Sequence, residues 1–443
     1  MNKIKGRMFY IAFVASLGGL LFGFDTAVIS GAEKAIQQAF SLTPFWHGFT
    51  IAAALIGTII GAFFCDRPSE KYGRKKLLII IAILYFISAF GNATVRNWYF
   101  FIFFRLLGGL AVGASSVVGP IYIAEISPSK WRGRFVAFFQ FNIVLGIVVA
   151  YFTNYAVVGH RLWFMEDWQL MLGIEAIPAI LFAILLFTVP ESPRWLIKTG
   201  KVEDGRDVLA QTGGQDLDVA VAEIKASLAE SAPSGEKLFQ KKYRVPILIA
   251  FLVASLNQLT GINAILYYAP RILETSGVFH EGAMLQSTIV GLTNLTFTML
   301  GMFLIDKVGR KKLLIVGSIG MVISLALVAR GFFLNRFDGY YMLLCIMGYI
   351  AFFAISLGAT IWVLISEVFP NSVREKGQKF GSMTHWTWDA LLTWFFPMFL
   401  SIGGGYIFSF FALIALLSII FALRIPETKG KSLEQIQMEL TKQ

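Results

Sequence analysis

The segment KYGRKKLLI at residues 71–79 returns with a single substitution as KVGRKKLLI at residues 307–315. Further matches follow in the same order, with Glu125, Pro128 and Arg132 recurring as Glu367, Pro370 and Arg374, and Pro190-Glu191 recurring as Pro426-Glu427. A repeat that extends over so much of the sequence indicates that the chain is built from two similar halves.

The repeat lies in a chain of 443 residues, of which 56% are hydrophobic and only 15% are charged, with a mean hydropathy of +0.69. Soluble domains average about 45–50% apolar and about 25% charged residues. This composition therefore excludes an ordinary soluble domain and indicates a polytopic membrane protein that contacts the lipid bilayer.

Twelve apolar runs are long enough to cross roughly 30 Å of hydrocarbon. They are continuously apolar and rich in Gly and Phe, which is typical of membrane helices and not of barrel strands. They lie near residues 8–31, 46–65, 77–94, 98–124, 134–158, 168–189, 245–271, 283–305, 313–333, 339–366, 379–401 and 403–423. The sequence thus predicts an all-α membrane protein with twelve transmembrane helices in two pseudo-symmetric six-helix bundles.

A charged segment with several glycines separates the two halves, and residues 202–210 and 217–228 within it are predicted as short cytoplasmic helices. We expect an N-terminal bundle over residues 1–190, a linker over 191–243, a C-terminal bundle over 244–424 and a cytoplasmic tail over 425–443. Parallel halves of this kind place a substrate near the middle of the membrane and rock around it, which favours a transporter over an enzyme.

The sequence contains no phosphate-binding loop, zinc signature or nucleophile elbow. We therefore expect no catalytic residue, no metal and no cofactor, and we expect that a gradient supplies the energy. Most of the 38 Lys and Arg residues lie in the termini and in the connections from even to odd spans. This asymmetry predicts that both termini are cytoplasmic in the inner membrane, and it explains the net charge of +11 without a nucleic-acid partner.

Asp25 lies well inside the first predicted span, where an ionised carboxylate costs about 2.5–3.5 kcal/mol on insertion scales unless it is protonated or paired. Arg105 in the fourth span is its natural partner. Desolvation favours the protonated form of Asp25, whereas the Arg105 charge favours the ionised form. This balance predicts a group that can exchange protons. A static ion pair is the alternative.

Four amide side chains fall inside predicted spans: Gln140, Gln258, Asn263 and Asn294. Buried amides are costly unless they form hydrogen bonds with another helix or with a ligand. Amides that donate and accept, together with a flat aromatic wall, suit a sugar, which offers hydroxyls and an apolar face. Position alone leaves both interpretations open, hydrogen bonding between helices and hydrogen bonding to a sugar.

The basic repeats mix charges of both signs at helix ends, which simple topology signalling does not explain. We expect these groups to pair and to form an inner gate that closes when the substrate site faces outward. The gate residues are Glu70, Arg74, Glu125, Arg132, Glu191, Arg194, Asp306, Arg310, Glu367 and Arg374. Glu175 inside the sixth span forms a plain hydrogen bond between helices, or it belongs with these functional charges, as the family resemblance described below implies.

Several motifs occur together in one order and spacing over nearly the whole chain. They are GGLLFGFDTAVISG at 18–31, Arg105 with Gly108, Gly109 and Gly113, Arg132-Gly133, PESPR at 190–194, QLTGIN at 258–263, DKVGR at 306–310 and PETKG at 426–430. In this combination the chain resembles the sugar porter family of the major facilitator superfamily, and within it the bacterial proton-coupled D-xylose and hexose symporters. The resemblance implies the major facilitator fold.

The same resemblance implies roles for individual residues. An acid at Asp25 accompanies proton symport in this family, whereas an uncharged amide accompanies passive uniport. The intramembrane amides become sugar contacts, and Phe22, Tyr267, Trp362 and Trp386 become the aromatic walls and gates of the sugar site.

The chain departs from the family pattern at several positions. Asn257 stands where a second Gln is usual beside Gln258, Ala359 replaces a Pro, and Glu375 replaces a Gly. His385 takes the place of a sugar-binding amide, and Asp389 lies four residues later on the same helical face. His385 either hydrogen-bonds the sugar and makes its affinity depend on pH, or forms a structural pair with Asp389.

These observations predict a monomeric secondary transporter that imports a monosaccharide, an aldose such as D-xylose or D-glucose, together with a proton by alternating access. The alternatives are a passive sugar facilitator and a sugar sensor that does not transport.

Overall fold

A computed structural model describes residues 2–162, 165–212, 216–230, 236–337, 339–370, 372–431 and 435–436. Most of these residues are helical, and an isolated bridge joins Leu162 to Met165. A helix satisfies its backbone hydrogen bonds within one segment, which is what an apolar run requires in lipid. The predicted all-α membrane fold is confirmed, although residues 432–434 and 437–443 of the predicted tail lie outside the described part of the chain.

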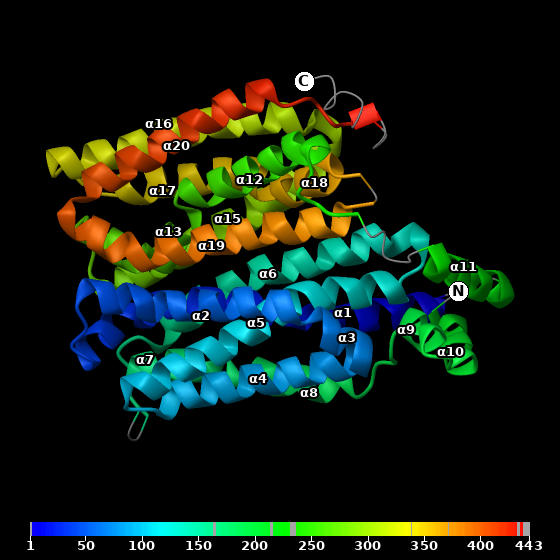
Figure 1. Ribbon diagram of the computed structural model, residues 1–443. Coiled ribbons are helices and arrows are strands. Elements are labelled where there is room, and N and C mark those ends of the chain that lie inside the picture. Colours follow the sequence, from blue (N-terminus) through cyan, green and yellow to red (C-terminus); the bar gives the residue numbers. More distant parts are fainter. Residues whose placement is uncertain are drawn as a thin grey trace. The chain divides into compact units, whose positions relative to one another are not determined.

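Eight helices cover the region of the first six predicted spans (Figure 1). They are α1 (Asn2–Ala39), α2 (Pro44–Phe64), α3 (Asp66–Tyr72), α4 (Arg74–Thr94), α5 (Trp98–Ile126), α6 (Ser129–Val157), α7 (Asp167–Ile174) and α8 (Ala176–Leu186). Three short helices follow in the charged segment: α9 (Pro193–Lys198), α10 (Val202–Thr212) and α11 (Leu217–Glu230). The last two confirm the short helices predicted at 202–210 and 217–228.

The second half of the sequence repeats the pattern with more interruptions. Its elements are the 3-10 turn η1 (Lys241–Tyr243), α12 (Arg244–Leu259), α13 (Ile262–Tyr267), α14 (Ala269–Glu274), α15 (His280–Val308), α16 (Arg310–Leu334), α17 (Tyr341–Phe353), the π-helical turn η2 (Ala354–Gly358), α18 (Ala359–Val368), α19 (Arg374–Ile402) and α20 (Gly404–Arg424).

In the described part of the chain, 11 segments are helical, long and apolar enough to cross a membrane. The remaining predicted span, 379–401, falls in α19, a helix of 29 residues that carries charged and polar side chains such as Lys379, His385 and Asp389. Large apolar side chains stay exposed along the spans, for example Ile177 at 69% and Leu344 at 63%. Such surfaces suit contact with lipid.

The chain divides into two compact units, one made of Met1–Ala32, Ile56–Thr153 and Val157–Ser234, and the other of Glu33–Leu55, Asn154–Ala156 and Gly235–Gln443. The end of α1 and the first half of α2 therefore belong with the second unit. The first predicted span ends at residue 31, whereas α1 continues to Ala39 because residues 32–39 are mostly good helix formers.

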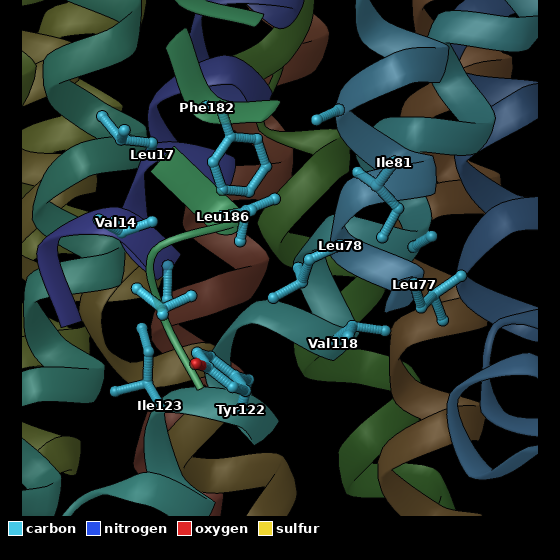
Figure 2. Close-up of a cluster of buried hydrophobic side chains, with 14 of the residues drawn as sticks. Val14, Leu17, Leu77, Leu78, Ile81, Val118, Tyr122, Ile123, Phe182 and Leu186 are labelled. Atoms are coloured by element: carbon cyan, nitrogen blue, oxygen red, sulfur yellow. The ribbon is translucent and has the colours of Figure 1, made fainter. Parts of the chain in front are cut away.

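The core of the first unit is an apolar cluster between α1, α4, α5 and α8 (Figure 2). Val14 and Leu17 on α1, Leu78 and Ile81 on α4, and Phe182 on α8 belong to this cluster. Figure 1 shows α4 beside α8, and the two helices pack against each other. Gly23 brings α1 close to α6, because a Cβ atom there would lie 1.8 Å from the Ile143 carbonyl oxygen.

Helix breaks mark four places inside predicted spans, one of them at Tyr268 between α13 and α14, and none of them was predicted from the sequence. The α7–α8 break falls at Glu175, the α12–α13 break at Thr260 and Gly261, and the π-helical turn η2 separates α17 from α18. Broken and π-helical segments in membrane proteins often lie next to binding sites. Glu175, Gln258 and Asn263, described below, lie at or next to two of these breaks.

Candidate functional site

A buried ion pair joins α1 to α5 in the first unit. Arg105 Nη1 donates to Asp25 Oδ1 over 3.1 Å, and the two side chains are 2% and 3% exposed, respectively. Gly108, one turn after Arg105, lets α5 approach α4 closely, because a Cβ atom there would lie 2.4 Å from Ser88 Oγ. The pairing predicted from the sequence is present.

Glu175 is a second carboxyl in this cluster. It is buried at the α7–α8 break and interacts electrostatically with both Asp25 and Arg105. Glu175 Oε1 and Arg105 Nε are buried without a hydrogen-bond partner among the described residues. Two carboxyls and one guanidinium leave an excess negative charge in a buried site unless one carboxyl holds a proton.

The second unit contains a polar cluster where α12 ends. Gly261 has φ +92°, which lets the chain turn from α12 into α13 and places Gln258 and Asn263 on either side of the turn. Asn263 Nδ2 donates to Gln258 Oε1 over 3.2 Å. Asn257 Nδ2 donates to the Leu357 carbonyl of the π-helical turn over 3.2 Å. Asn257, Gln258 and Asn263 are therefore brought together.

Helix α19 adds an imidazole and a carboxyl to this cluster. Gln258 Nε2 lies 3.0 Å from His385 Nε2, and because an amide N–H donates, the ring nitrogen accepts. Asn263 Nδ2 donates to Asp389 Oδ2 over 2.6 Å. Of the two alternatives for His385, the structural pair with Asp389 is not formed among the described residues: His385 bonds Gln258 and Asp389 bonds Asn263, both on the α12–α13 segment.

Aromatic rings flank His385 in the same unit. The Trp362 ring on α18 lies 4.9 Å from the imidazole, between ring centroids, and the Trp386 ring lies 5.1 Å away in an edge-on arrangement. Trp362 is 41% exposed, so one side of its indole is open. Tyr267 is buried in α13. The predicted aromatic groups therefore include one ring that can stack on a ligand.

Three other predicted sugar contacts take part in none of the hydrogen bonds described above. Asn294 on α15 accepts a hydrogen bond from Thr298 over 3.3 Å. In the first unit, Phe22 on α1 packs against the apolar cluster, and Gln140 is half-buried on α6. Sugar contact by these three residues stays a prediction.

The first basic repeat forms a cluster at the start of α4. Arg74 binds Glu125 through Nε and Nη2 over 2.9 and 3.0 Å, and Glu70 through Nη2 over 2.9 Å. Glu191 accepts hydrogen bonds from the backbone nitrogens of Arg74 and Lys75. A carboxylate at the N-terminus of a helix is stabilised by these free N–H groups and by the helix dipole.

The second repeat reproduces this arrangement within the second unit. Arg310 lies 2.9 Å from Glu367 and 3.2 Å from Asp306, and Glu427 accepts from the backbone nitrogen of Arg310. Gly73 and Gly309 precede the two helices with φ +94° and +99°. The matching geometry explains why the sequence repeats Gly-Arg at these positions.

The remaining predicted gate residues have other contacts. Arg132 Nε donates to the Ala124 carbonyl, and Arg194 Nη2 donates to Ser227 on α11. Arg374 Nε and Nη2 are buried without a hydrogen-bond partner among the described residues. The gating role of all ten charged residues stays a prediction.

One buried charged group was not predicted from the sequence. Glu33 on α1 accepts from Arg271 Nε on α14 over 2.8 Å and hydrogen-bonds His47 Nε2 on α2 over 2.7 Å. Glu33 lies just beyond the end of the first predicted span, and His47 lies at the start of the second. A charge at the end of a span is common, so it does not indicate a buried site. The sequence feature that could have indicated this cluster is the presence of the acidic Glu33 and the basic Arg271 near the ends of predicted spans.

Comparison with known proteins places this geometry in a family. Residues 11–440 match the family described as sugar (and other) transporter. The chain is 38% identical over 468 residues to the D-xylose-proton symporter of Escherichia coli strain K12, covering 97% of this chain and 95% of that protein. It is 37% identical over 441 residues to the arabinose-proton symporter of Bacillus subtilis strain 168, covering 98% and 95%.

Solved structures give the same result. The inward open conformation of the E. coli xylose transporter XylE superimposes with a TM-score of 0.87 at 36% sequence identity, covering 98% of this chain and 99% of that chain. A partially occluded inward open conformation of the same transporter gives a TM-score of 0.85, covering 96% and 100%. The chain is a multi-pass membrane protein and not an enzyme, and it belongs to the sugar transporter family.

Proposed function

We propose that this chain imports a monosaccharide, an aldose such as D-xylose or D-glucose, together with a proton by alternating access. The observation that carries the proposal is that the chain contains two buried polar clusters, one in each unit. One is a cluster of two carboxyls and one guanidinium around Asp25, and the other is a cluster of amide, imidazole and indole groups around Gln258. The printed names of the relatives above support a pentose and a proton as the transported pair.

The proton is carried by Asp25. When Asp25 is protonated, an ionised Glu175 balances the charge of Arg105, with which it interacts electrostatically, and the buried cluster is neutral. When Asp25 is ionised, it hydrogen-bonds Arg105 at 3.1 Å. These two arrangements have different partners for the same guanidinium. A conformational change that alters the contacts of Arg105 therefore changes the proton affinity of Asp25.

The sugar is held by the second unit. Gln258, Asn263 and Asn257 supply amide donors and acceptors for hydroxyl groups, and the open side of the Trp362 indole supports an apolar sugar face. Asn294 on α15 of the same unit is proposed as a further sugar contact. Sugar hydroxyls replace the hydrogen bonds that these amides make to one another, so little hydrogen bonding is lost when the sugar leaves.

The paired clusters around Arg74 and Arg310 hold the cytoplasmic helix ends of their own units. Each joins the start of one helix to a carboxylate of another, Glu125 or Glu367. Rigid ends of this kind let a bundle move as one body during alternating access. Both termini are proposed to be cytoplasmic, and the transporter is proposed to act as a monomer.

Counterflow in proteoliposomes tests the transported substrate. Purified protein is reconstituted into vesicles loaded with unlabelled sugar, and entry of labelled D-xylose is measured against a panel of pentoses, hexoses, cyclitols and disaccharides. Competition confined to one or a few monosaccharides supports the proposal. A lack of counterflow with every sugar contradicts it. Counterflow without accumulation under a pH gradient assigns the chain to passive facilitators.

A further inference from the structure

The second unit contains a buried acid, Asp389, that belongs to none of the charged clusters described above. Asp389 on α19 has no exposed surface. Its Oδ2 accepts from Asn263 Nδ2 over 2.6 Å, and its Oδ1 accepts from Thr393 Oγ1 over 3.3 Å. Asp389 takes part in none of the ion pairs formed by the described residues. An ionised carboxylate inside a span is costly without a cationic partner, which makes this group a candidate to hold a proton.

Several titratable and charged groups on α19 and on the elements that pack against it bond other partners, and Arg374 is the first residue of α19, 15 positions before Asp389. His385 on α19 itself accepts from Gln258, and Tyr268 donates to the Thr393 carbonyl. His47 on α2 bonds Glu33, and Glu367 on α18 bonds Arg310. Arg244 is the first residue of α12, and Arg424 is the last residue of α20. Among the described residues, Asp389 therefore depends on two neutral donors.

One of those two donors is a proposed sugar contact. Asn263 Nδ2 has two N–H groups, and both are used, one on Asp389 Oδ2 and one on Gln258 Oε1. A sugar oxygen that accepts from Asn263 must displace one of these bonds. The bond to Asp389 is the shorter, and its loss removes the main stabilisation of the ionised carboxylate.

We propose that Asp389 is a second proton-binding group, whose proton occupancy is linked to sugar binding through Asn263. This inference rests on the proposed function, because it requires that Asn263 contacts the sugar. When sugar binds, the Asn263 amide turns to the sugar and a proton from water binds Asp389. When sugar leaves, Asn263 returns to Asp389 and the proton is released to water. Linkage is reciprocal, so proton binding to Asp389 also strengthens sugar binding.

Proton uptake on sugar binding tests this link directly. The Asp25→Asn variant removes the first acid and leaves Asp389 intact. In weakly buffered detergent solution with a pH-indicator dye, addition of D-xylose to Asp25→Asn is expected to raise the pH of the solution, because Asp389 takes up protons. Uptake is measured per bound sugar, with binding followed independently by calorimetry. The Asp25→Asn/Asp389→Asn double variant is expected to bind D-xylose without this uptake.

Each outcome has a defined meaning. Binding of D-xylose by Asp25→Asn with no proton uptake between about pH 5.5 and 7.5 overturns the second site and leaves the proposed symport intact. Persistent uptake in the double variant also overturns it. A failure of the parent protein to bind any sugar contradicts the proposed function itself. If the double variant does not fold, Thr393→Val in the Asp25→Asn background removes the other donor, and it must shift the pH at which uptake is half-maximal; an unshifted pH overturns the site.

Discussion

Arg105 binds Asp25 through one of its terminal nitrogens, Nη1, while Arg105 Nε stays buried without a hydrogen-bond partner among the described residues. A structural ion pair between Arg and a carboxylate is commonly bidentate, with two parallel N–H···O bonds. The single bond at 3.1 Å leaves the guanidinium free to favour another acceptor, and Glu175 lies near enough to interact with it. The geometry suits a pair that re-forms in each transport cycle.

Loss of the Gln258 side chain should weaken sugar binding more than folding. Gln258→Ala removes hydrogen bonds between uncharged groups, which are worth about 0.5–1.5 kcal/mol each, or roughly a 2- to 10-fold increase in sugar Kd per bond. The measurement is a ligand-induced thermal shift with D-xylose. Gln286→Ala, a half-buried Gln on α15, is the matched control and should retain the parent shift. An unchanged Kd in Gln258→Ala would move the sugar site elsewhere.

The His385 ring is expected to act as a hydrogen-bond acceptor for Gln258. His385→Gln keeps an acceptor of similar reach, so sugar affinity should stay close to that of the parent protein. His385→Leu keeps the volume and removes the acceptor, so affinity should fall by about 2- to 10-fold. Calorimetric titration with D-xylose separates the two variants. Equal affinities for Leu and Gln would show that the bond to Gln258 does not orient the site.

Gly73 should tolerate no side chain. Its φ of +94° lies in a region that is costly for other residues, by about 1–3 kcal/mol, and a Cβ atom would approach Glu191 Oε2 to 2.3 Å. Gly73→Ala is therefore expected to lower the thermal unfolding temperature. Gly133→Ala, a helical position with nothing within 4 Å of the added carbon, is the control and should leave that temperature unchanged or raised. Equal unfolding temperatures in both variants would contradict the assigned capping geometry.

The Arg74–Glu125 pair should contribute to stability as a buried unit. Its side chains are only 8% and 11% exposed, and removing one partner of a buried pair costs about 3–5 kcal/mol. Arg74→Met should therefore lower the unfolding free energy strongly, and Arg74→Met/Glu125→Met should lose less than the sum of the single variants. Lys198→Met breaks the exposed ion pair with Glu70 and should cost less than about 1 kcal/mol. Additive single losses would show that the two residues act independently.

The helical fold could be predicted from the sequence because its signals are local. Apolar runs and the duplicated Gly-Arg segments give the spans and the two halves without knowledge of packing. The breaks at Glu175 and Gly261 and the π-helical turn at Ala354–Gly358 could not be predicted, because neighbouring helices stabilise them. α19 was identified despite its polar residues, which reduce its hydropathy.

The part of the candidate site that could be predicted contains charged residues inside spans, because a charge in the membrane needs a partner that neutralises it. Asp25 and Arg105 required partners, and each is the other's partner. His385 and Asp389 lie one turn apart, but their hydrogen bonds come from the α12–α13 segment, and spacing along one helix does not reveal neighbours from another. The cluster of Glu33, His47 and Arg271 could not be predicted, because charged residues are common at the ends of membrane spans.

Accumulation of sugar against its gradient tests the central claim most directly. Proteoliposomes with an imposed inward proton gradient are given labelled D-xylose, and the ratio of internal to external sugar is followed with and without a protonophore. The parent protein should accumulate sugar above equilibrium only while the gradient lasts. Asp25→Asn should equilibrate sugar without accumulation, while Asp218→Asn, at an exposed acid on α11, should accumulate like the parent. Full accumulation by Asp25→Asn, or protonophore-insensitive accumulation by the parent, would contradict proton coupling through Asp25.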